Sequence, residues 1–454
     1  MRRTTSWPSG IFRVFSSVEE IPRAGTKWRC VPSDLGLVTG FQCVSCGREY
    51  PPDGALYTCP SCGLDGILDT RYDYDAVRRL LTRDRLEADS RHSHWRYLPL
   101  LPISERARLP LLPVGWTPIH DMTPLAQQFG LRAVYLKDEG RNPTASLKDR
   151  ASSVGVVKAV QRGSSEITCA STGNAASSLA GQAVQMGLRA YIFLPAKVSE
   201  SKLAQILIYG ATVFKVRGTY EDAFRISMAA AERWGWYNRN SGINPILVEG
   251  KKTAGLEIAE QLRWEPPDVV VVPVGDGCTL AGIYKGLREM NLLGLTSRTP
   301  RVIGVQAAGA SPIEKAFRTG TTMRAEPSQT IADGIAVGMP RNWRKALNAV
   351  RESGGTFVTV SDDEILDAMR MLARVTGIWG EPAAVAGVAA LAHLVERGDI
   401  GRSDRVLLMI TGTGLKDIPS TLRAAGGALE IDPSLEAVER IMAREPHLAA
   451  RRDK

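Results

Sequence analysis

One lysine stands out among the residues that could do covalent chemistry. Lys148 lies in the polar stretch 142–150, between an apolar run and an Ala/Val-rich segment expected to be helical. A lysine amine is a useful nucleophile when desolvation or neighbouring cations lower its pKa, and a loop that opens into a cleft between domains can provide both. Lys148 is therefore a candidate for a Schiff base, although most lysines of a protein are solvated surface residues.

The loop 171–174, which reads Ser-Thr-Gly-Asn, follows an apolar run and precedes a segment with the periodicity of a helix. Hydroxyl groups and free backbone N–H groups at a helix N-terminus favour an anion, so a carboxylate fits there. The same residues could instead cap the helix, because Ser171, Thr172 and Asn174 are all suitable N-cap residues. Both interpretations stay open at this point.

A glycine-containing loop follows the apolar run 269–274. Glycines let the backbone close around a phosphate, and a threonine adds a hydroxyl donor. The loop lacks the third glycine of a dinucleotide-binding fingerprint, since Leu280 stands there, and it lacks the Gly-Lys pair of a P-loop. What remains is a phosphate on a smaller cofactor, bound by the loop Gly275-Asp276-Gly277-Cys278-Thr279.

A third loop, 411–417, ends the apolar run 406–410. A hydroxyl such as that of Thr411 can hydrogen-bond a heteroaromatic nitrogen without protonating it, which leaves the ring a moderate electron sink. Such tuning favours elimination and replacement over transamination. An ordinary turn between a strand and a helix would account for the same residues.

Four of the seven cysteines form a C-x2-C-x12-C-x2-C pattern. Two such pairs can place four thiolates at the corners of a tetrahedron that suits Zn²⁺, and Gly47 and Gly63 relieve the tight turns after each pair. A closed four-sulfur site leaves no open coordination position, so its metal is expected to be structural. Cys169 and Cys278 are expected to be small buried hydrophobes. The predicted zinc ligands are Cys43, Cys46, Cys59 and Cys62.

The chain has 454 residues, of which 44% are hydrophobic and 23% charged, enough for two or three domains of a soluble globular protein. Its net charge of +9 comes from scattered arginines, which is more typical of solvated faces than of nucleic-acid binding. No apolar run reaches the roughly 18 residues that a membrane helix needs, and residues 1–15 lack a continuous apolar core. We expect a cytoplasmic protein that binds neither membrane nor nucleic acid.

Apolar strand-like runs alternate with Ala/Leu-rich helical segments from residue 133 onward. This alternation predicts an α/β fold with a mostly parallel sheet covered on both faces by helices. Ligands bind beyond the carboxyl ends of such strands, which is where the loops 171–174, 275–279 and 411–417 lie. The expected strands are 133–136, 166–170, 190–194, 212–216, 269–274, 302–306 and 406–410.

These loops, in this order, resemble the fold-type II pyridoxal-phosphate enzymes of the tryptophan synthase beta superfamily, and specifically the threonine synthase group. The similarity covers roughly residues 40–420, including a zinc ribbon that some members carry. It implies a two-domain α/β fold with mostly parallel sheets after a small zinc ribbon, pyridoxal 5'-phosphate as cofactor and a homodimer. The matching motifs are 146–150, 171–174, 244–253, 275–279, 380–383 and 411–417.

The resemblance also implies a division of the chain into domains. An N-terminal extension would span 1–40 and the zinc ribbon 41–70. The large cofactor-binding domain would consist of 71–140 and 241–430, and a small domain with the substrate-facing loop would span 141–240. The segment 431–454 would form a C-terminal helix and tail.

Carried over by motif, the resemblance assigns roles to the loop residues. Lys148 would form the Schiff base with the cofactor and later act as acid and base at the substrate's α and β carbons. Asn174 would hydrogen-bond the cofactor's 3-oxygen, and Thr411 would meet its pyridine nitrogen. Ser171, Thr172 and Gly173 would lie near the substrate or its carboxylate, and the backbone of Gly275, Asp276, Gly277, Cys278 and Thr279 would hold the cofactor phosphate.

The chain departs from the family pattern at several positions. Family members usually carry glycine, phenylalanine, glycine and histidine where this chain has Ala145, Leu147, Ala151 and Thr413. These departures bear on the substrate rather than on the cofactor.

Another departure concerns a substrate phosphate. Ala336 stands where many threonine synthases have an arginine, and the segment around it is closer to serine/threonine dehydratases. An arginine is the natural bidentate partner of a phosphate. If the substrate is phosphorylated, another residue such as Arg217, Lys251 or Lys252 would have to substitute.

The leading hypothesis is elimination with replacement on a small, activated and phosphorylated amino acid, with O-phosphohomoserine and water giving threonine and phosphate. The alternatives among enzymes are a serine or threonine dehydratase and a β-replacement synthase acting on O-phosphoserine. An alternative of another class is a non-catalytic protein that contacts nucleic acid through its basic surface and zinc ribbon. Against it stand the retained Lys148 and ribbon tips without a basic-aromatic cluster.

Overall fold

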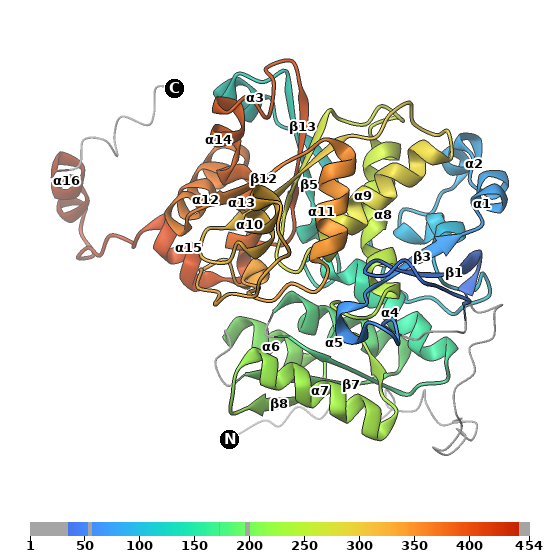
Figure 1. The fold of residues 1–454 in the computed structure, drawn as a ribbon. Coiled ribbons are helices and arrows are strands. Elements are labelled where there is room, and N and C mark those ends of the chain that lie inside the picture. Colours follow the sequence, from blue (N-terminus) through green and yellow to red (C-terminus); the bar gives the residue numbers. More distant parts are fainter. Residues whose placement is uncertain (1–34, 53–56, 172, 196–199, 445–454) are drawn as a thin grey trace, which may run out of the picture.

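The computed structural model describes residues 35–52, 57–171, 173–195 and 200–444, and Figure 1 shows its arrangement. Three sheets organise the described part of the chain. The largest has the strand order β12-β11-β10-β13-β5-β4, in which all pairs are parallel except β4 with β5. Its strands are β4 (Ile119–Asp121), β5 (Ala133–Asp138), β10 (Val269–Pro273), β11 (Arg301–Ala307), β12 (Phe357–Val360) and β13 (Arg405–Ile410).

Helices cover both faces of this sheet, because successive strand residues point to opposite sides. Val269 and Val271 of β10 pack into one apolar cluster with α12 (Asp362–Thr376) and α13 (Pro382–Ala389). Val270 and Val272 pack into another cluster, with α8 (Ile246–Gln261), α9 (Cys278–Leu292) and α11 (Trp343–Ser353). All five residues of β10 are buried, as the apolar run predicts.

A second sheet has the order β8-β7-β6-β9 and is entirely parallel. Helix α5 ends at a glycine C-cap, where Gly187 adopts a positive φ of 69°. The elements of this unit are α4 (Lys148–Gln161), β6 (Glu166–Ala170), α5 (Asn174–Met186), β7 (Arg189–Pro195), α6 (Glu200–Ile208), β8 (Thr212–Val216), α7 (Tyr220–Trp234) and β9 (Tyr237–Asn238).

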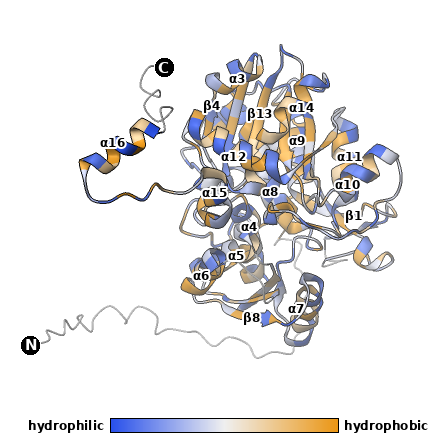
Figure 2. Ribbon diagram, turned by 90° about the vertical axis from the view of Figure 1, so that its left-hand side faces the viewer, coloured by the Kyte–Doolittle hydropathy of each residue, from blue (hydrophilic) through white to orange (hydrophobic). Residues whose placement is uncertain are grey.

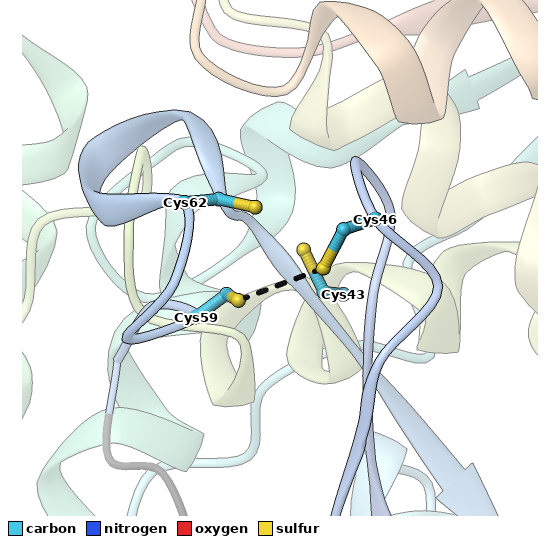
Figure 3. A group of neighbouring side chains, drawn as sticks. All are labelled: Cys43, Cys46, Cys59 and Cys62. Atoms are coloured by element: carbon cyan, nitrogen blue, oxygen red, sulfur yellow. Dashed lines mark hydrogen bonds between the residues drawn. The ribbon is translucent and has the colours of Figure 1, made fainter.

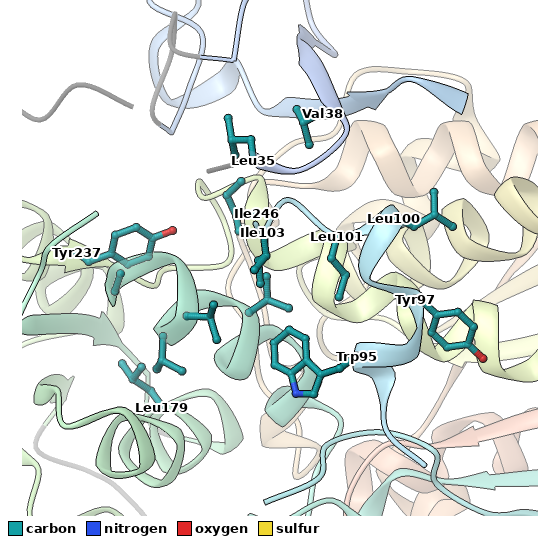
Figure 4. Packing of buried hydrophobic residues seen from close by; sticks show 14 of the residues in the cluster. Leu35, Val38, Trp95, Tyr97, Leu100, Leu101, Ile103, Leu179, Tyr237 and Ile246 are labelled. Carbon is teal, nitrogen blue, oxygen red and sulfur yellow. The ribbon is translucent and has the colours of Figure 1, made fainter. Parts of the chain in front are cut away.

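The third sheet is the small antiparallel ribbon β2-β1-β3, built from β1 (Val38–Cys43), β2 (Glu49–Tyr50) and β3 (Leu68–Tyr72). Figure 4 shows Leu35 and Val38 of this region in the same buried cluster as Trp95 of η3 (His94–Leu100) and Leu179 of α5. The ribbon is thus packed onto the body of the molecule by one continuous apolar core.

The remaining elements connect these units. Helix α16 lies apart from the body in Figures 1 and 2. Among the described residues, no helix combines the length and the apolar character needed to cross a membrane. The further elements are α1 (Tyr74–Leu80), α2 (Arg83–Ala88), α3 (Thr123–Phe129), α10 (Pro312–Thr319), α14 (Leu391–Glu396), α15 (Ile418–Ala425) and α16 (Leu435–Arg444), with short 3-10 turns η2 (Gly63–Asp65), η4 (Glu139–Arg141), η5 (Asp333–Ile335) and η6 (Gly414–Lys416).

The α/β class with mostly parallel sheets after a small cysteine-containing ribbon is confirmed, and all seven expected strands are present. The domain boundaries stay a prediction, although the strand memberships agree with a chain that leaves the large sheet after β5 and returns to it at β10. The expected extension 1–40 lies mostly outside the described residues, as do Thr172 and the last ten residues.

Candidate active site

Lys148 is the first residue of α4, at the point where the loop after β5 and η4 turns into a helix. Its side chain is half-buried. Removal from water and the nearby charge of Lys251 lower the pKa of Lys148 to about 8, so that a substantial part of the amine is neutral near neutral to mildly basic pH. The sequence expectation of an activated lysine is supported by this environment.

The loop before Lys148 is held by its neighbours in the chain. The Asp149 carboxylate accepts hydrogen bonds from the Thr144 backbone N–H at 2.7 Å and the Thr144 hydroxyl at 2.9 Å. Burial raises the pKa of Asp149 to about 6 despite these donors. Ala145, between them in the chain, has a positive φ of 64°, a conformation that suits glycine better than alanine. The tight turn explains why glycine is common at that position in the family.

Beneath this loop lies a fully buried ionic network centred on Arg150. Its guanidinium donates to both oxygens of Glu139 at 2.7 Å and to the oxygens of Glu257 at 2.6 and 2.7 Å. Lys137 adds a further ion pair to Glu257 at 2.8 Å. The network ties the start of α4 to the end of β5 and to α8, which fixes the direction in which Lys148 leaves the backbone.

The loop 171–174 does not cap α5 with a side chain. Gly173 is the N-cap residue and makes no side-chain cap hydrogen bond, while the Ser171 hydroxyl accepts from the Gly173 N–H at 3.2 Å. Thr172 lies outside the described residues. Asn174 donates its Nδ2 to Glu381 Oε1 at 2.5 Å, and within the described structure its buried Oδ1 has no hydrogen-bond partner. The interpretation of this loop as a binding loop is therefore favoured over the simple cap.

The glycine loop 275–279 opens α9. Gly277 has a φ of 95°, and a Cβ there would lie 2.8 Å from the Asn342 carbonyl oxygen, so only glycine fits. As in α5, no side chain caps the helix, so its first-turn N–H groups are open to an anionic ligand. The Asp276 carboxylate turns away from this turn and accepts from the Arg341 N–H at 2.8 Å and the Asn342 side chain at 2.7 Å.

Cys278 makes a polar contact in addition to packing in the core. It is buried, as expected, but its Sγ accepts a hydrogen bond from Lys251 Nζ at 2.7 Å. Lys251 comes from α8 and carries the charge that most lowers the pKa of Lys148. This lysine therefore connects the glycine loop with the candidate nucleophile.

Thr411 lies at the carboxyl end of β13, directly beside the lysine loop. Its carbonyl oxygen accepts from the Leu147 N–H at 2.9 Å, and Ser146 forms a bridge with Gly412. A Cβ at Gly412 would lie 2.6 Å from Glu381 Oε1 and 3.4 Å from Asn174 Nδ2. Three loops from both parallel sheets thus meet around Lys148, as the positions of the strand ends predict.

These residues fit pyridoxal phosphate. An uncapped helix start with two required glycines, Gly275 and Gly277, suits a phosphate. The buried Asn174 amide has an unpartnered Oδ1 in the described structure, and its Nδ2 has a second N–H that can donate to a ring oxygen. Thr411 bonds the lysine loop through its backbone carbonyl oxygen, so its side-chain hydroxyl is not needed for that contact and could serve a ring nitrogen. Burial raises the pKa of Glu381, although Lys202 and Lys416 oppose this shift.

Sequence reasoning missed several side chains at this site. Glu381 belongs to a matching motif, but nothing in that motif indicated its contact with Asn174. Lys416, which donates to Ser177 at 3.1 Å, lies in the motif 411–417, but the motif gave it no role. Lys202, which donates to Asp333 at 2.7 Å, carries no signal in spacing or composition.

The three cations proposed to replace the missing arginine lie in different environments. Lys252 is fully buried in ion pairs with Glu249 at 2.6 Å and Glu289 at 2.9 Å, so it has no free charge for a substrate. Arg217 is exposed just after β8. Lys251 lies at the site but contacts Cys278 of the glycine loop. None of the three is a direct counterpart of the arginine.

The four clustered cysteines come together in the ribbon, as Figure 3 shows. Their sulfur atoms all lie within 4.8 Å of one another, and the Sγ atoms of Cys46 and Cys59 are 3.8 Å apart. Zinc–sulfur bonds of about 2.3 Å in a tetrahedron require sulfur separations of about 3.8 Å. Gly47 and Gly63 have positive φ angles of 74° and 58°, which the two turns after the cysteine pairs require. The clustered residues, which could hold a metal ion, are Cys43, Cys46, Cys59 and Cys62.

Comparison with known proteins gives the same class. Residues 111–412 match the family model described as pyridoxal-phosphate dependent enzyme. The threonine synthase of Methanosarcina acetivorans is 41% identical over 402 residues, which is 88% of this chain and 97% of that protein. The threonine synthase of Methanocaldococcus jannaschii is 38% identical over 404 residues, 88% of this chain and 98% of that protein.

Solved structures show the same fold. Threonine deaminase isoform 2 from Solanum lycopersicum has a TM-score of 0.60 at 18% identity, covering 89% of this chain and 98% of that one. The chain belongs to the family of pyridoxal-phosphate-dependent enzymes. The resemblance to the threonine synthase group noted in the sequence is confirmed.

Proposed function

We propose that this enzyme is a threonine synthase, which converts O-phosphohomoserine and water to threonine and phosphate. The observation that carries this proposal is the identity of 38–41% to two threonine synthases over nearly their whole lengths. The site supports it, because loops with separate places for a cofactor phosphate, a ring and an amino acid meet at one lysine.

Bound pyridoxal phosphate would supply an electron sink that stabilises negative charge at the substrate's α-carbon. In our proposal Lys148 holds the cofactor and moves protons at the α and β carbons. The N-terminal turn of α9, with Gly275, Gly277 and Thr279, binds the cofactor phosphate together with Lys251.

Other residues would orient the ligand groups. Asn174 hydrogen-bonds the ring's 3-oxygen, and Thr411 bonds the ring nitrogen without protonating it. Ser171, Thr172 and Gly173 bind the substrate carboxylate at the start of α5. Glu381 holds the Asn174 side chain in place through the contact at 2.5 Å.

We further propose that the cysteine cluster binds one structural zinc ion. Its support is the sulfur geometry and the closed four-ligand set. A cytoplasmic location agrees with cysteines kept as thiols, and a homodimer follows from the family resemblance alone.

A product assay separates this function from its alternatives. Purified enzyme is incubated with O-phosphohomoserine, O-phosphoserine, serine and threonine, and phosphate, oxoacid, ammonia and threonine are measured separately. Threonine and phosphate in equal amounts from O-phosphohomoserine support the proposal. Oxoacid and ammonia from serine or threonine, without phosphate release from phosphohomoserine, would identify a dehydratase instead.

A further inference from the structure

Buried cations in this protein fall into two groups. Away from the site, the buried lysines and arginines whose contacts are described form ion pairs with carboxylates, because an unpaired buried charge is costly. Examples are Arg96 with Glu260 at 2.6 Å and Lys137 with Glu257 at 2.8 Å. Around Lys148, in contrast, Arg239, Lys251 and Lys416 have no carboxylate partner within the described part of the chain.

Arg239 is one of these buried cations. It follows β9 and is only 1% exposed. Its Nε donates to the Ser152 hydroxyl at 3.0 Å, and one terminal nitrogen donates to the Ser241 hydroxyl at 3.0 Å. The other terminal nitrogen is 3.5 Å from the Lys148 carbonyl oxygen. The hydrogen-bond partners of this guanidinium in the described structure are thus two hydroxyl groups and a distant carbonyl, and no carboxylate is among them.

The segment that carries Arg239 lies between the two binding loops. The Asn240 side chain accepts from the Ala170 N–H at 2.8 Å, next to the substrate loop. The Ser241 carbonyl accepts from Asn342 Nδ2 at 3.3 Å, and the same Nδ2 bonds Asp276 of the glycine loop at 2.7 Å. The charge of Arg239 also reaches Lys148, whose pKa it helps to lower.

We propose that Arg239 binds the phosphate monoester of the substrate. It would thereby replace the arginine that many threonine synthases have at the position of Ala336. This inference rests on the proposed function. A guanidinium fork held by two serines is preorganised for bidentate contact with a phosphate dianion. Arg239 is thereby a specificity-determining residue, which favours phosphorylated over unphosphorylated amino acids.

The cofactor carries the other phosphate in the site, but that group has its own partners. The first turn of α9 supplies backbone donors, and Lys251 supplies a positive charge beside Cys278. Arg239 belongs instead to the segment next to β6, because its neighbour Asn240 accepts from the Ala170 N–H, and the proposed function assigns the following loop 171–174 to the amino acid. The substrate phosphate is therefore assigned to Arg239 and the cofactor phosphate to α9 with Lys251.

The test compares Arg239→Gln with the wild-type holoenzyme. Binding of 2-amino-5-phosphonopentanoate, a stable phosphonate analogue of O-phosphohomoserine, and of norvaline, which lacks the phosphonate, is followed through the cofactor's visible spectrum. Cofactor affinity is measured separately by titrating apoprotein. We expect the Kd of the phosphonate to rise about 10- to 100-fold, because charge-assisted hydrogen bonds contribute a free energy of that size to binding. The Kd values of norvaline and of the cofactor should change less than about threefold.

Two further variants keep the outcome clear. Arg225→Gln removes an exposed arginine of α7 and should change no Kd. Arg239→Lys keeps the positive charge without the planar guanidinium and should give an intermediate loss of phosphonate affinity. This variant also tests the proposal if Arg239→Gln does not fold. The assignment would be overturned by any of three results: an equal loss of affinity for the phosphonate and for norvaline, an unchanged Kd of the phosphonate, or a loss confined to cofactor affinity. Failure of the proposed function is distinct, because wild type would then form no threonine.

Discussion

At the scale of single residues, reactivity depends on where charges lie around one amine. Lys148 is flanked by Lys251 and Arg239, and both positive charges add to desolvation in lowering its pKa. The same cations are the partners that anionic ligands would find in the site. Activation of the lysine and binding of phosphates thus arise from the same side chains.

The pKa of about 8 predicts how apoprotein reacts with pyridoxal phosphate. Because only the neutral amine attacks the aldehyde, the rate should rise about tenfold per pH unit below pH 8 and level off above it, rather than rise to the ordinary value of 10.5. Stopped-flow absorbance at saturating cofactor measures this profile. Lys251→Met should move the midpoint upward, and a rate still rising steeply at pH 10 would refute the shift.

Ala145 predicts a stabilising substitution. Its φ of 64° costs an alanine about 1–2 kcal/mol, and part of this returns as the entropy that glycine loses on folding. Ala145→Gly should therefore stabilise the protein by about 0.5–1 kcal/mol in urea unfolding. Ala151→Gly is the matched control, because Ala151 lies inside α4 and the same change should destabilise by about 1 kcal/mol. A loss of stability in Ala145→Gly would contradict the account.

At the scale of elements, the start of α4 is the feature that positions the chemistry. Arg150 lies two residues after Lys148 and joins η4, α4 and α8 through Glu139 and Glu257, with no exposure of any of the three side chains. A buried cation with two carboxylates sets one direction for the helix rather than a range of directions. The network therefore orients the side chain of Lys148 through the backbone of α4, without a direct contact to it.

Removal of Arg150 tests the network. Arg150→Met should destabilise the protein by about 3–5 kcal/mol, because Glu139 loses its cation and Glu257 keeps only Lys137. Denaturant unfolding measures the change. Arg78→Met, which removes an exposed ion pair with Asp75, should cost at most about 0.5 kcal/mol. A similar effect of the two substitutions would show that the buried network does not hold the element.

The elements themselves were largely predictable. Short, valine-rich apolar runs such as 269–274 favour strands covered on both faces, and they predict the parallel sheets. The short strands β4, β9 and β12 escaped detection, because two to four residues carry too little periodicity and β4 lies at an edge.

At the scale of the whole molecule, the ribbon contacts the helices around the proposed phosphate site. Asp69 of β3 accepts from Lys285 of α9 and Lys345 of α11, both at 3.1 Å. Tyr72 donates to Glu249 of α8 at 2.9 Å. Figure 1 shows the ribbon strands beside these helices. The proposed zinc ion would therefore support the catalytic body through the ribbon.

Metal content and stability test this coupling. One zinc ion per chain is expected, and Cys59→Ser or strong chelation should release it and lower the thermal midpoint by several degrees. Cys169→Ser changes a buried cysteine outside the cluster and should leave the zinc content unaltered. Zinc-free protein with an unchanged midpoint would show that the cluster is not a structural metal site.

Contacts between distant segments set the limit of prediction from sequence. Lys148, the glycine loop and Thr411 could be found because each belongs to a motif after a strand. Arg239 could not, since nothing in its local sequence shows that the side chain is buried without a carboxylate. Its environment exists only once β6, β9 and α4 are packed together.

The central claim is that Lys148 carries the cofactor, and hydride trapping tests it most directly. Purified enzyme saturated with pyridoxal phosphate is reduced with borohydride, digested and analysed by mass spectrometry, with Lys148→Ala in parallel. The account predicts loss of the visible absorption band and one cofactor adduct on the peptide that contains Lys148, with neither in the variant. An adduct on Lys251 or Lys416 in place of Lys148, or no adduct at all, would contradict it.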